Sequence, residues 1–219
     1  MAVCLKSGLF SVFKRLNIHS ILAIAGMAGP LVLAVTDFTA AFTNPGYSLV
    51  SHSISSLALT RLGWLQTIGF LAIGLLVEVF VAGLLFNIRG VRGFHFSIGL
   101  LVFFGFGLLL IGAFRTDPVG AETTIEGAIH GATANTVFWL FPVTILLLAP
   151  SLRNDPNWRN IFIYTVVAGI SALVFAVVLG FLKDKISWFG LYERILVGNM
   201  IIWVEVTAIK LLRLSVNRG

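Results

Sequence analysis

Long apolar runs, separated by short polar interruptions, dominate the whole chain. A helix that crosses the hydrocarbon core of a bilayer needs about 20 consecutive, mainly apolar residues. The runs of that length predict spans near 19–40, 63–86, 94–114, 130–150, 160–182 and 191–212. The interruptions are too short to hold a soluble domain, and no internal repeat is visible. The pattern therefore predicts an all-α fold, a polytopic six-transmembrane-helix bundle that forms one domain over 1–219.

Two segments outside these runs have patterns of their own. In residues 47–59, serine and histidine positions fall on one side of a helical wheel and most apolar positions on the other, which predicts a short amphipathic helix. In residues 1–18, apolar positions alternate with Lys6, Lys14 and Arg15, which is typical of a helix lying in the membrane interface. A cleaved signal peptide is the alternative, but the long first apolar run favours a retained helix.

Composition supports lipid as the main solvent of this chain. Hydrophobic residues make up 58% and charged residues 11% of the sequence, whereas about a quarter of the residues in a soluble domain are charged. The net charge of +6 raises the question of nucleic acid. No basic run or basic patch with interleaved aromatics is present, so we expect no nucleic-acid partner. The lone Cys4 excludes an internal disulfide and a cysteine zinc cluster.

The distribution of lysine and arginine predicts the orientation in the membrane, because these residues favour cytoplasmic connections. On the side of the termini lie ten: Lys6, Lys14, Arg15, Arg89, Arg92, Arg153, Arg159, Lys210, Arg213 and Arg218. On the opposite side lie five: Arg61, Arg115, Lys183, Lys185 and Arg194. We therefore expect a multi-pass protein of the plasma membrane with both termini in the cytoplasm.

The connection FRTDPVGAETTIEGAIH, residues 114–130, is unusually polar for its place between two apolar runs. Asp117 precedes a proline that ends the third span, and Thr123 or Thr124 can cap the fourth. His130 falls inside the fourth span, where a histidine needs a polar partner. Asp117 is the expected partner. The pair is predicted either to fasten two helix ends or to be part of a binding or catalytic site.

Several outer segments together predict a polar pocket at the outer face. Its candidate ligand-binding residues are Tyr47, Ser48, His52, Ser55, Arg115, Asp117, His130, Glu193 and Arg194. Arg115 or Arg194 is the expected contact for an anionic group. The hypothesis is that membrane lipids are the partners, and that the pocket binds a lipid head group or another amphiphile. The alternative is that the serines of 47–59 simply face water.

Four short motifs resemble a known family of membrane proteins. They are Tyr47-Ser48 with the Ser-rich turn after it, Asp117-Pro118, His130, and Glu193-Arg194. The chain resembles, over residues 20–212, the uncharacterised prokaryotic six-helix family catalogued as domain of unknown function 998. The resemblance implies six helices and singles out the same outer residues, but it implies no activity. A carboxylate that the family often has near Ser55 or Ser56 is absent here, which argues against a mechanism that requires that acid.

An intramembrane metal-dependent hydrolase is the alternative function of the same pocket. The candidate catalytic residues His52, Asp117 and His130 would supply three ligands for a zinc ion with an open position for water. No His-x-x-x-His or His-Glu-x-x-His spacing supports this site. A serine nucleophile, Ser51 or Ser55 with His130 as its base, lacks the strand–turn–helix elbow of such enzymes. The sequence therefore leaves open whether the protein is an enzyme.

A small proton-coupled transporter is a further alternative. Glu78 and Glu205 lie at similar depths inside the second and sixth predicted spans. Two such carboxylates could share a proton, as coupled-transport sites do. Each could instead have a local partner, such as Lys210 for Glu205. Because no third intramembrane charge continues a pathway, the local explanation is favoured.

Overall fold

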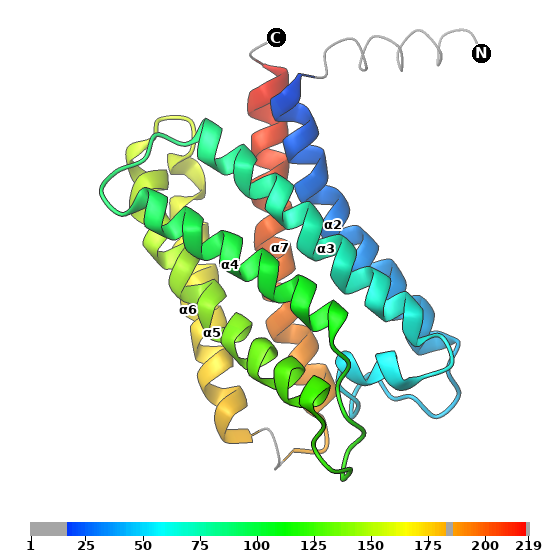
Figure 1. Cartoon of the computed structure of the whole chain (residues 1–219). Coiled ribbons are helices and arrows are strands. Elements are labelled where there is room, and N and C mark those ends of the chain that lie inside the picture. Colours follow the sequence, from blue (N-terminus) through cyan, green and yellow to red (C-terminus); the bar gives the residue numbers. More distant parts are fainter. Residues whose placement is uncertain (1–16, 183–185, 218–219) are drawn as a thin grey trace, which may run out of the picture.

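The computed structural model describes residues 17–182 and 186–217, and the long elements of this part of the chain are all helices. Six of them are long and apolar enough to cross a membrane, so the chain is a multi-pass membrane protein (Figure 1). They are α2 (Ile18–Phe42), α3 (Gly63–Asn87), α4 (Phe94–Ala113), α5 (Ile125–Asn154), α6 (Phe162–Leu182) and α7 (Phe189–Val216). The predicted six-helix membrane bundle is confirmed.

Capping residues determine where two of these helices begin. The Asn17 side chain accepts a hydrogen bond from the Ser20 N–H at 2.9 Å, which starts α2. The Thr124 hydroxyl accepts one from the Gly127 N–H at 3.1 Å, which starts α5 and confirms one of the two predicted caps. Helix α5 therefore begins at Ile125, before the predicted span 130–150. The prediction followed the apolar run, whereas the first turn of the helix contains the polar Glu126.

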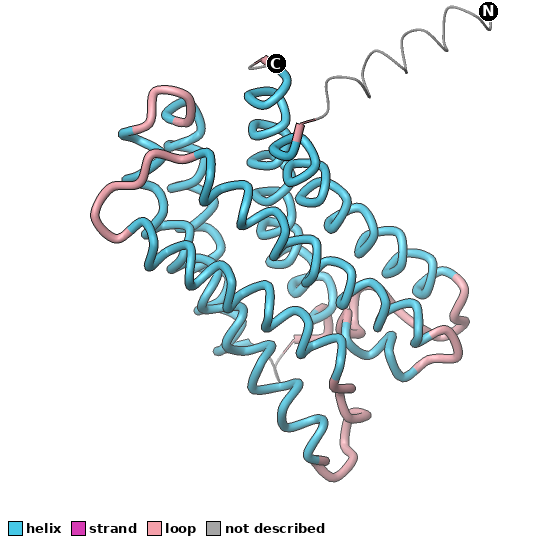
Figure 2. The backbone as a smooth tube through the Cα atoms, turned by 45° about the horizontal axis from the view of Figure 1, so that its top comes forward, coloured by secondary structure: helices cyan, strands magenta, loops and turns pink. Residues whose placement is uncertain are grey.

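The helices form a closed bundle in which each helix packs on the next one along the chain, and α7 closes the ring against α2 and α6 (Figures 1 and 2). The start of α2 is fastened to the end of α7, since the Asn17 amide donates to the Ser215 carbonyl at 3.2 Å. The hydroxyls of Ser20 and Ser215 also hydrogen-bond at 2.9 Å. We call this the proximal end. The opposite end, where α3, α5 and α7 begin, is the distal end.

An aromatic cluster joins the middle of the bundle. The Phe141 ring lies 4.9 Å from the Phe104 ring and 5.6 Å from the Trp203 ring, measured between centroids. The Trp203 indole also donates to the Thr165 hydroxyl at 3.0 Å, so the cluster connects α4, α5, α6 and α7. The cluster thereby holds these four helices together in the middle of the bundle. The candidate site lies at the distal end.

Asp155 and its neighbours hold the connections of the proximal end. The Asp155 carboxylate accepts a hydrogen bond from the Arg89 N–H at 2.8 Å. The Trp158 indole donates to the Asn87 carbonyl at 2.9 Å, and this tryptophan is fully buried. The buried Asp155 therefore has a structural role at this end.

The distal loop, residues 43–62, differs from the prediction of an amphipathic helix over 47–59. A 3₁₀ helix, η1, covers only Ser55–Leu59, and turns precede it. The carbonyls of Leu49 and His52 accept hydrogen bonds from a distant arginine instead of from the next helical turn. Tertiary contacts therefore replace the helix that the pattern favours. The interfacial segment predicted within 1–18 lies outside the described residues up to residue 16, as do Lys183 and Lys185.

Candidate functional site

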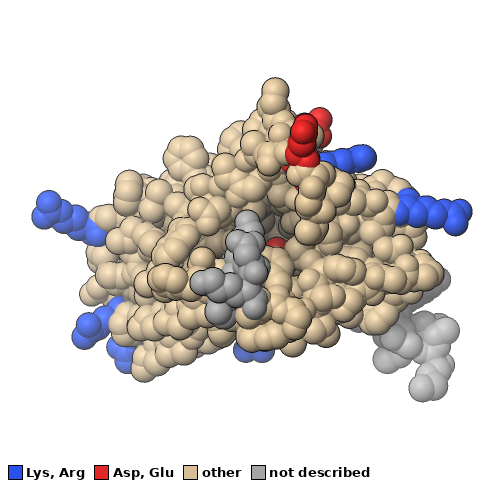
Figure 3. All heavy atoms as spheres, turned by 90° about the horizontal axis from the view of Figure 1, so that it is seen from below, with Lys and Arg blue, Asp and Glu red and all other residues tan. Residues whose placement is uncertain are grey.

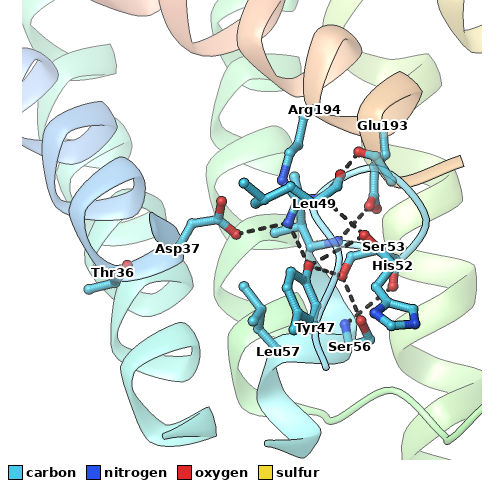
Figure 4. A network of polar contacts seen from close by, with 12 residues as sticks. Thr36, Asp37, Tyr47, Leu49, His52, Ser53, Ser56, Leu57, Glu193 and Arg194 are labelled. Atoms are coloured by element: carbon cyan, nitrogen blue, oxygen red, sulfur yellow. Dashed lines mark hydrogen bonds and ion pairs between the residues drawn. The ribbon is translucent and has the colours of Figure 1, made fainter. Parts of the chain in front are cut away.

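Arg194, near the start of α7, fixes the distal loop to the bundle (Figure 4). Its Nη1 donates to the carbonyls of Leu49, His52 and Gly190 at 3.1, 3.0 and 3.1 Å. Hydrogen bonds from a charged donor are stronger than neutral ones. Two of these carbonyls belong to the distal loop, so the guanidinium joins the loop to the first turn of α7.

The second amino group of Arg194 extends this network to α2 (Figure 4). Its Nη2 donates to the Tyr47 hydroxyl at 2.5 Å and forms an ion pair with Asp37 at 3.5 Å. Burial raises the pKa of the Tyr47 hydroxyl, although the hydrogen bond and charge of Arg194 oppose that shift. The phenol is therefore neutral at pH 7, and it donates to the Ser53 carbonyl at 2.7 Å. Arg194 consequently acts as a structural tie between three segments.

Glu193 and the adjacent backbone hold the loop from the other side of α7. The Glu193 carboxylate accepts a hydrogen bond from the Ile54 N–H at 2.7 Å. The Leu191 N–H donates to the Val50 carbonyl at 3.0 Å. These contacts place the residues before η1 directly against the start of α7.

Asp117 caps α5 through Thr124. One carboxylate oxygen accepts from the Thr124 N–H at 2.9 Å and the other from its hydroxyl at 2.8 Å. Gly127 lies against this carboxylate so closely that a Cβ there would be 1.8 Å from Asp117 Oδ2. The predicted hydrogen bond between Asp117 and His130 is wrong, because Asp117 pairs with the nearby helix start instead.

His130 pairs with the backbone rather than with an acid. His130 is 4% exposed, and its Nδ1 lies 2.8 Å from the Phe114 carbonyl oxygen. A carbonyl can only accept a hydrogen bond, so Nδ1 carries the proton, and Nε2 of the neutral ring is an acceptor. This Nε2 is buried and has no hydrogen-bond partner among the described residues. His130 therefore presents an unused acceptor inside the protein.

His130 lines a cavity of about 170 Å³, here called the distal pocket, between α5, α6, α7 and the distal loop. Its polar lining residues are Ser53, Ser55, Thr116, His130, Asn135 and Glu193. Its apolar walls include Phe138, Trp139, Leu179 and Phe189. Seen from the distal end, the molecule is hollowed, and part of an acidic residue is visible within the hollow (Figure 3). The volume of the distal pocket is several times that of a single water molecule.

A small apolar cavity of about 40 Å³ lies next to the distal pocket, deeper in the bundle. The two cavities share four lining residues, Ser55, Ala134, Phe138 and Glu193. The rest of the inner cavity is lined by apolar side chains. A chamber with several polar lining residues thus lies beside a small apolar cavity.

The residues predicted to bind a ligand lie in three different places. Those that line the distal pocket are Ser55, His130 and Glu193. Those in the network around the distal loop are Tyr47, Ser48, His52 and Arg194. Asp117 caps α5, and Arg115 is exposed and is not among the lining residues. Neither arginine expected to contact an anion therefore lines the pocket.

Sequence reasoning missed Ser53, Thr116 and Asn135, which also line the distal pocket. Asn135 gave a usable signal, since it is a polar residue within an apolar span and follows His130 by little more than one helical turn. Ser53 and Thr116 gave none, because loop residues of this type usually face water. Their positions depend on how the loops fold over the bundle end.

The predicted zinc ligands are not brought together. No group of three His, Cys, Asp or Glu side chains suited to a metal ion occurs within residues 17–182 and 186–217. His52 instead accepts from the Ser48 N–H at 3.0 Å through Nδ1. Nor is a serine paired with His130, because its Nε2 lacks any partner in the described structure. Neither arrangement predicted for a hydrolase is assembled.

Glu78 and Glu205 lie apart from the distal pocket. The Glu78 carboxylate lies beside α4, where a Cβ on Gly105 would be 2.7 Å from Oε1. Glu205 Oε2 is buried without a hydrogen-bond partner among the residues described. Neither residue lines the distal pocket or the apolar cavity, although their neighbours Val77 and Val204 line the latter. These cavities therefore provide no polar route to the two acids.

Comparison with known protein families gives one match that covers most of the chain. The model described as "Protein of unknown function (DUF998)" matches residues 27–210. The matched range includes every residue that lines the distal pocket. The comparisons with curated proteins and with solved structures give no match.

Proposed function

The chain belongs to the DUF998 family, whose function is unknown, and we propose that it binds the head group of a membrane lipid or similar amphiphile in the distal pocket. The observation that carries this proposal is the buried Nε2 of His130, an acceptor without a partner in the described structure. Leaving a buried polar atom unpaired costs about 1–3 kcal/mol. Because His130 lines the distal pocket, a ligand in the pocket that reaches this atom with a hydrogen-bond donor would remove that cost.

The arrangement of the two cavities supports an amphiphile. The distal pocket contains the polar side chains, whereas the neighbouring inner cavity is lined almost entirely by apolar residues. Trp139 and Phe189 line the pocket at the distal end, and tryptophan is enriched at the level of lipid head groups. A molecule whose polar head lies in the distal pocket and whose apolar chain lies along the apolar walls of that pocket matches this lining. The hydrolase and transporter alternatives have no comparable support.

We also propose that the protein resides in the plasma membrane with its distal pocket facing outward. Basic residues of the described proximal end are Arg89, Arg92, Arg153, Arg159, Lys210 and Arg213. Those of the described distal end are Arg61, Arg115 and Arg194. The excess at the proximal end supports cytoplasmic termini.

Single cysteines test this orientation in a Cys4→Ser background. Val119, at the distal end, is fully exposed, and Asn157, at the proximal end, is also exposed and uncharged. On intact cells we expect a membrane-impermeant maleimide to label Val119→Cys and to label Asn157→Cys only after permeabilisation. The reverse pattern would overturn the orientation and leave the binding proposal untouched.

Amphiphile binding is tested by thermal unfolding of the protein in nanodiscs with dodecylamine, dodecyltrimethylammonium, 1-dodecanol and dodecanoate. At least one of these compounds is expected to stabilise the wild-type protein, by about 2.7 kcal/mol at a concentration of one hundred times Kd. Gly131→Leu and Gly180→Leu should abolish that stabilisation. Both glycines line the distal pocket, and both have open space where a Cβ would lie.

Gly99→Leu is the matched control for these two variants. Gly99 also has open space at its Cβ position, lies within α4, and does not line the distal pocket. It should keep the full stabilisation. The proposal fails if no compound stabilises the wild-type protein, or if both pocket variants respond as Gly99→Leu does.

A further inference from the structure

We infer that the proximal end carries a second site, here called the arginine cluster, which binds the phosphate groups of anionic phospholipids. Its members are Arg89 and Arg92, in the connection after α3, and Arg153 and Arg159, at the two ends of the turn after α5. The cluster lies at the opposite end of the bundle from the distal pocket, so the inference does not depend on the function proposed for that pocket.

Two connections that are far apart in the sequence are fastened to each other at the proximal end (Figures 1 and 2). The Arg89 N–H donates to the Asp155 carboxylate at 2.8 Å, and the Val91 N–H donates to the Ser151 hydroxyl at 3.3 Å. The Arg159 N–H donates to the Asp155 carbonyl at 2.9 Å. Arg89 and Arg159 therefore both bond to one residue through their backbone, which brings the two pairs of arginines to a common surface.

The positive charge of the arginine cluster has no acidic partner in the part of the chain that the structure describes. All four arginines are exposed, and none of them forms an ion pair there. The only acid in the described proximal connections is Asp155, which is 1% exposed and accepts from the Arg89 and Asn157 N–H groups, each at 2.8 Å. A ligand that approaches from outside therefore meets guanidinium groups and no exposed carboxylate.

Arg153 is positioned by an aromatic ring. Its Cζ lies 5.7 Å from the centroid of the Phe162 ring, at the start of α6. A cation–π contact uses the face of the guanidinium and leaves its N–H donors free. Guanidinium donors match the oxygens of a phosphate group in pairs. The side chain of Arg153 is therefore held in place with its donors available to a phosphate.

Exposed apolar side chains beside the arginine cluster favour a lipid over a soluble anion. Phe86, Phe96 and Ile163 are 67%, 65% and 72% exposed, and each lies within four positions of an arginine of the cluster. In a chain that crosses the membrane, such side chains contact acyl chains. The arginines thus lie where the apolar surface ends, at the level of the lipid phosphates. A free phosphate or a nucleic acid would use the charge without the apolar side chains.

Native mass spectrometry of the full chain in detergent, titrated with lipids of equal chain length, tests this inference. We expect phosphatidylglycerol to bind at least about tenfold more tightly than phosphatidylcholine, since each arginine beside an anionic lipid contributes about a factor of five. Inorganic phosphate at the same concentration should not displace the bound phosphatidylglycerol. Equal affinities for the two lipids, or displacement by inorganic phosphate, would overturn the inference.

Two double variants with the same change in charge locate the site. Arg92→Gln/Arg153→Gln should reduce the preference for phosphatidylglycerol about tenfold. Arg61→Gln/Arg115→Gln replaces two exposed arginines of the distal end and should keep the full preference. Equal losses in both would show a general effect of net charge and contradict a site. If Arg92→Gln/Arg153→Gln does not fold, Arg92→Gln/Arg159→Gln provides the same comparison.

The Gly131→Leu variant separates the arginine cluster from the distal pocket. Gly131 lines that pocket, so leucine should abolish amphiphile binding there and leave the preference for phosphatidylglycerol unchanged. Loss of the preference in this variant would place the anionic lipid in the distal pocket and overturn the inference. If instead the preference is kept and no amphiphile stabilises the wild-type protein, the proposed function alone fails.

Discussion

Arg194→Ala is expected to lower the free energy of unfolding by up to about 3–5 kcal/mol, the cost of removing one partner of a fully buried ion pair. The side chains of Arg194 and Asp37 are only 14% and 11% exposed, so water would hydrate the remaining carboxylate poorly. The substitution also removes the charged donor of the Leu49 and His52 carbonyls. The distal loop should consequently be held to α7 only by its contacts with Glu193 and the Leu191 N–H.

Unfolding of the purified protein in detergent measures this effect, and Arg61→Ala is its matched control. Arg61 is an exposed arginine of the same loop, so its replacement should change stability by less than about 0.5 kcal/mol. Asp37→Asn should reduce the effect of Arg194→Ala in a double-mutant cycle, because the stranded charge is then absent. Equal stability of the two alanine variants would show that Arg194 does not hold the loop.

The spans were predictable because lipid constrains both the length and the composition of a crossing helix. Even the error at the start of α5 has a simple cause. Hydropathy recognises the apolar run from residue 130, whereas the helix starts after its cap at Thr124. Capping signals locate such a start better than hydropathy does, and Thr124 was indeed among the predicted caps.

The partners of the site residues were much less predictable. His130 was expected to need a polar partner, and it has one, but this partner is the backbone carbonyl of Phe114. Asp117 bonds to Thr124, only seven positions along the chain, in preference to His130. Side-chain patterns indicate that a buried polar group must be satisfied, but they do not identify a carbonyl that every residue possesses.

Arg194 illustrates the same limit over a longer distance. Its position at the outer end of a span suggested a ligand contact, and its charge suggested an anion. Its actual partners include carbonyls of the distal loop, more than 140 positions earlier in the chain. The packing of α7 against α2 and the fold of the distal loop bring these groups together. The same packing leaves Glu193, the adjacent residue, at the pocket.

Gly190→Ala is expected to destabilise the protein by about 1–3 kcal/mol and to weaken amphiphile binding, because Gly190 allows the distal loop to lie directly on α7. A Cβ at this position would be 2.1 Å from the His52 carbonyl oxygen and 2.8 Å from its carbon. Backbone atoms cannot turn aside as the end of a flexible side chain can. The loop must therefore move, which breaks the 3.0 Å hydrogen bond from the Leu191 N–H to Val50.

Gly198→Ala in the same helix separates this steric effect from helix propensity. A Cβ at Gly198 meets nothing within 4 Å, so alanine should leave stability unchanged or raise it by up to about 1 kcal/mol. Unfolding of both variants, and their affinity for the amphiphile that stabilises the wild-type protein, provide the measurements. If Gly190→Ala behaves like Gly198→Ala in both, close contact between the loop and α7 is not needed for the pocket. If only stability falls, the loop supports the fold without shaping the binding site.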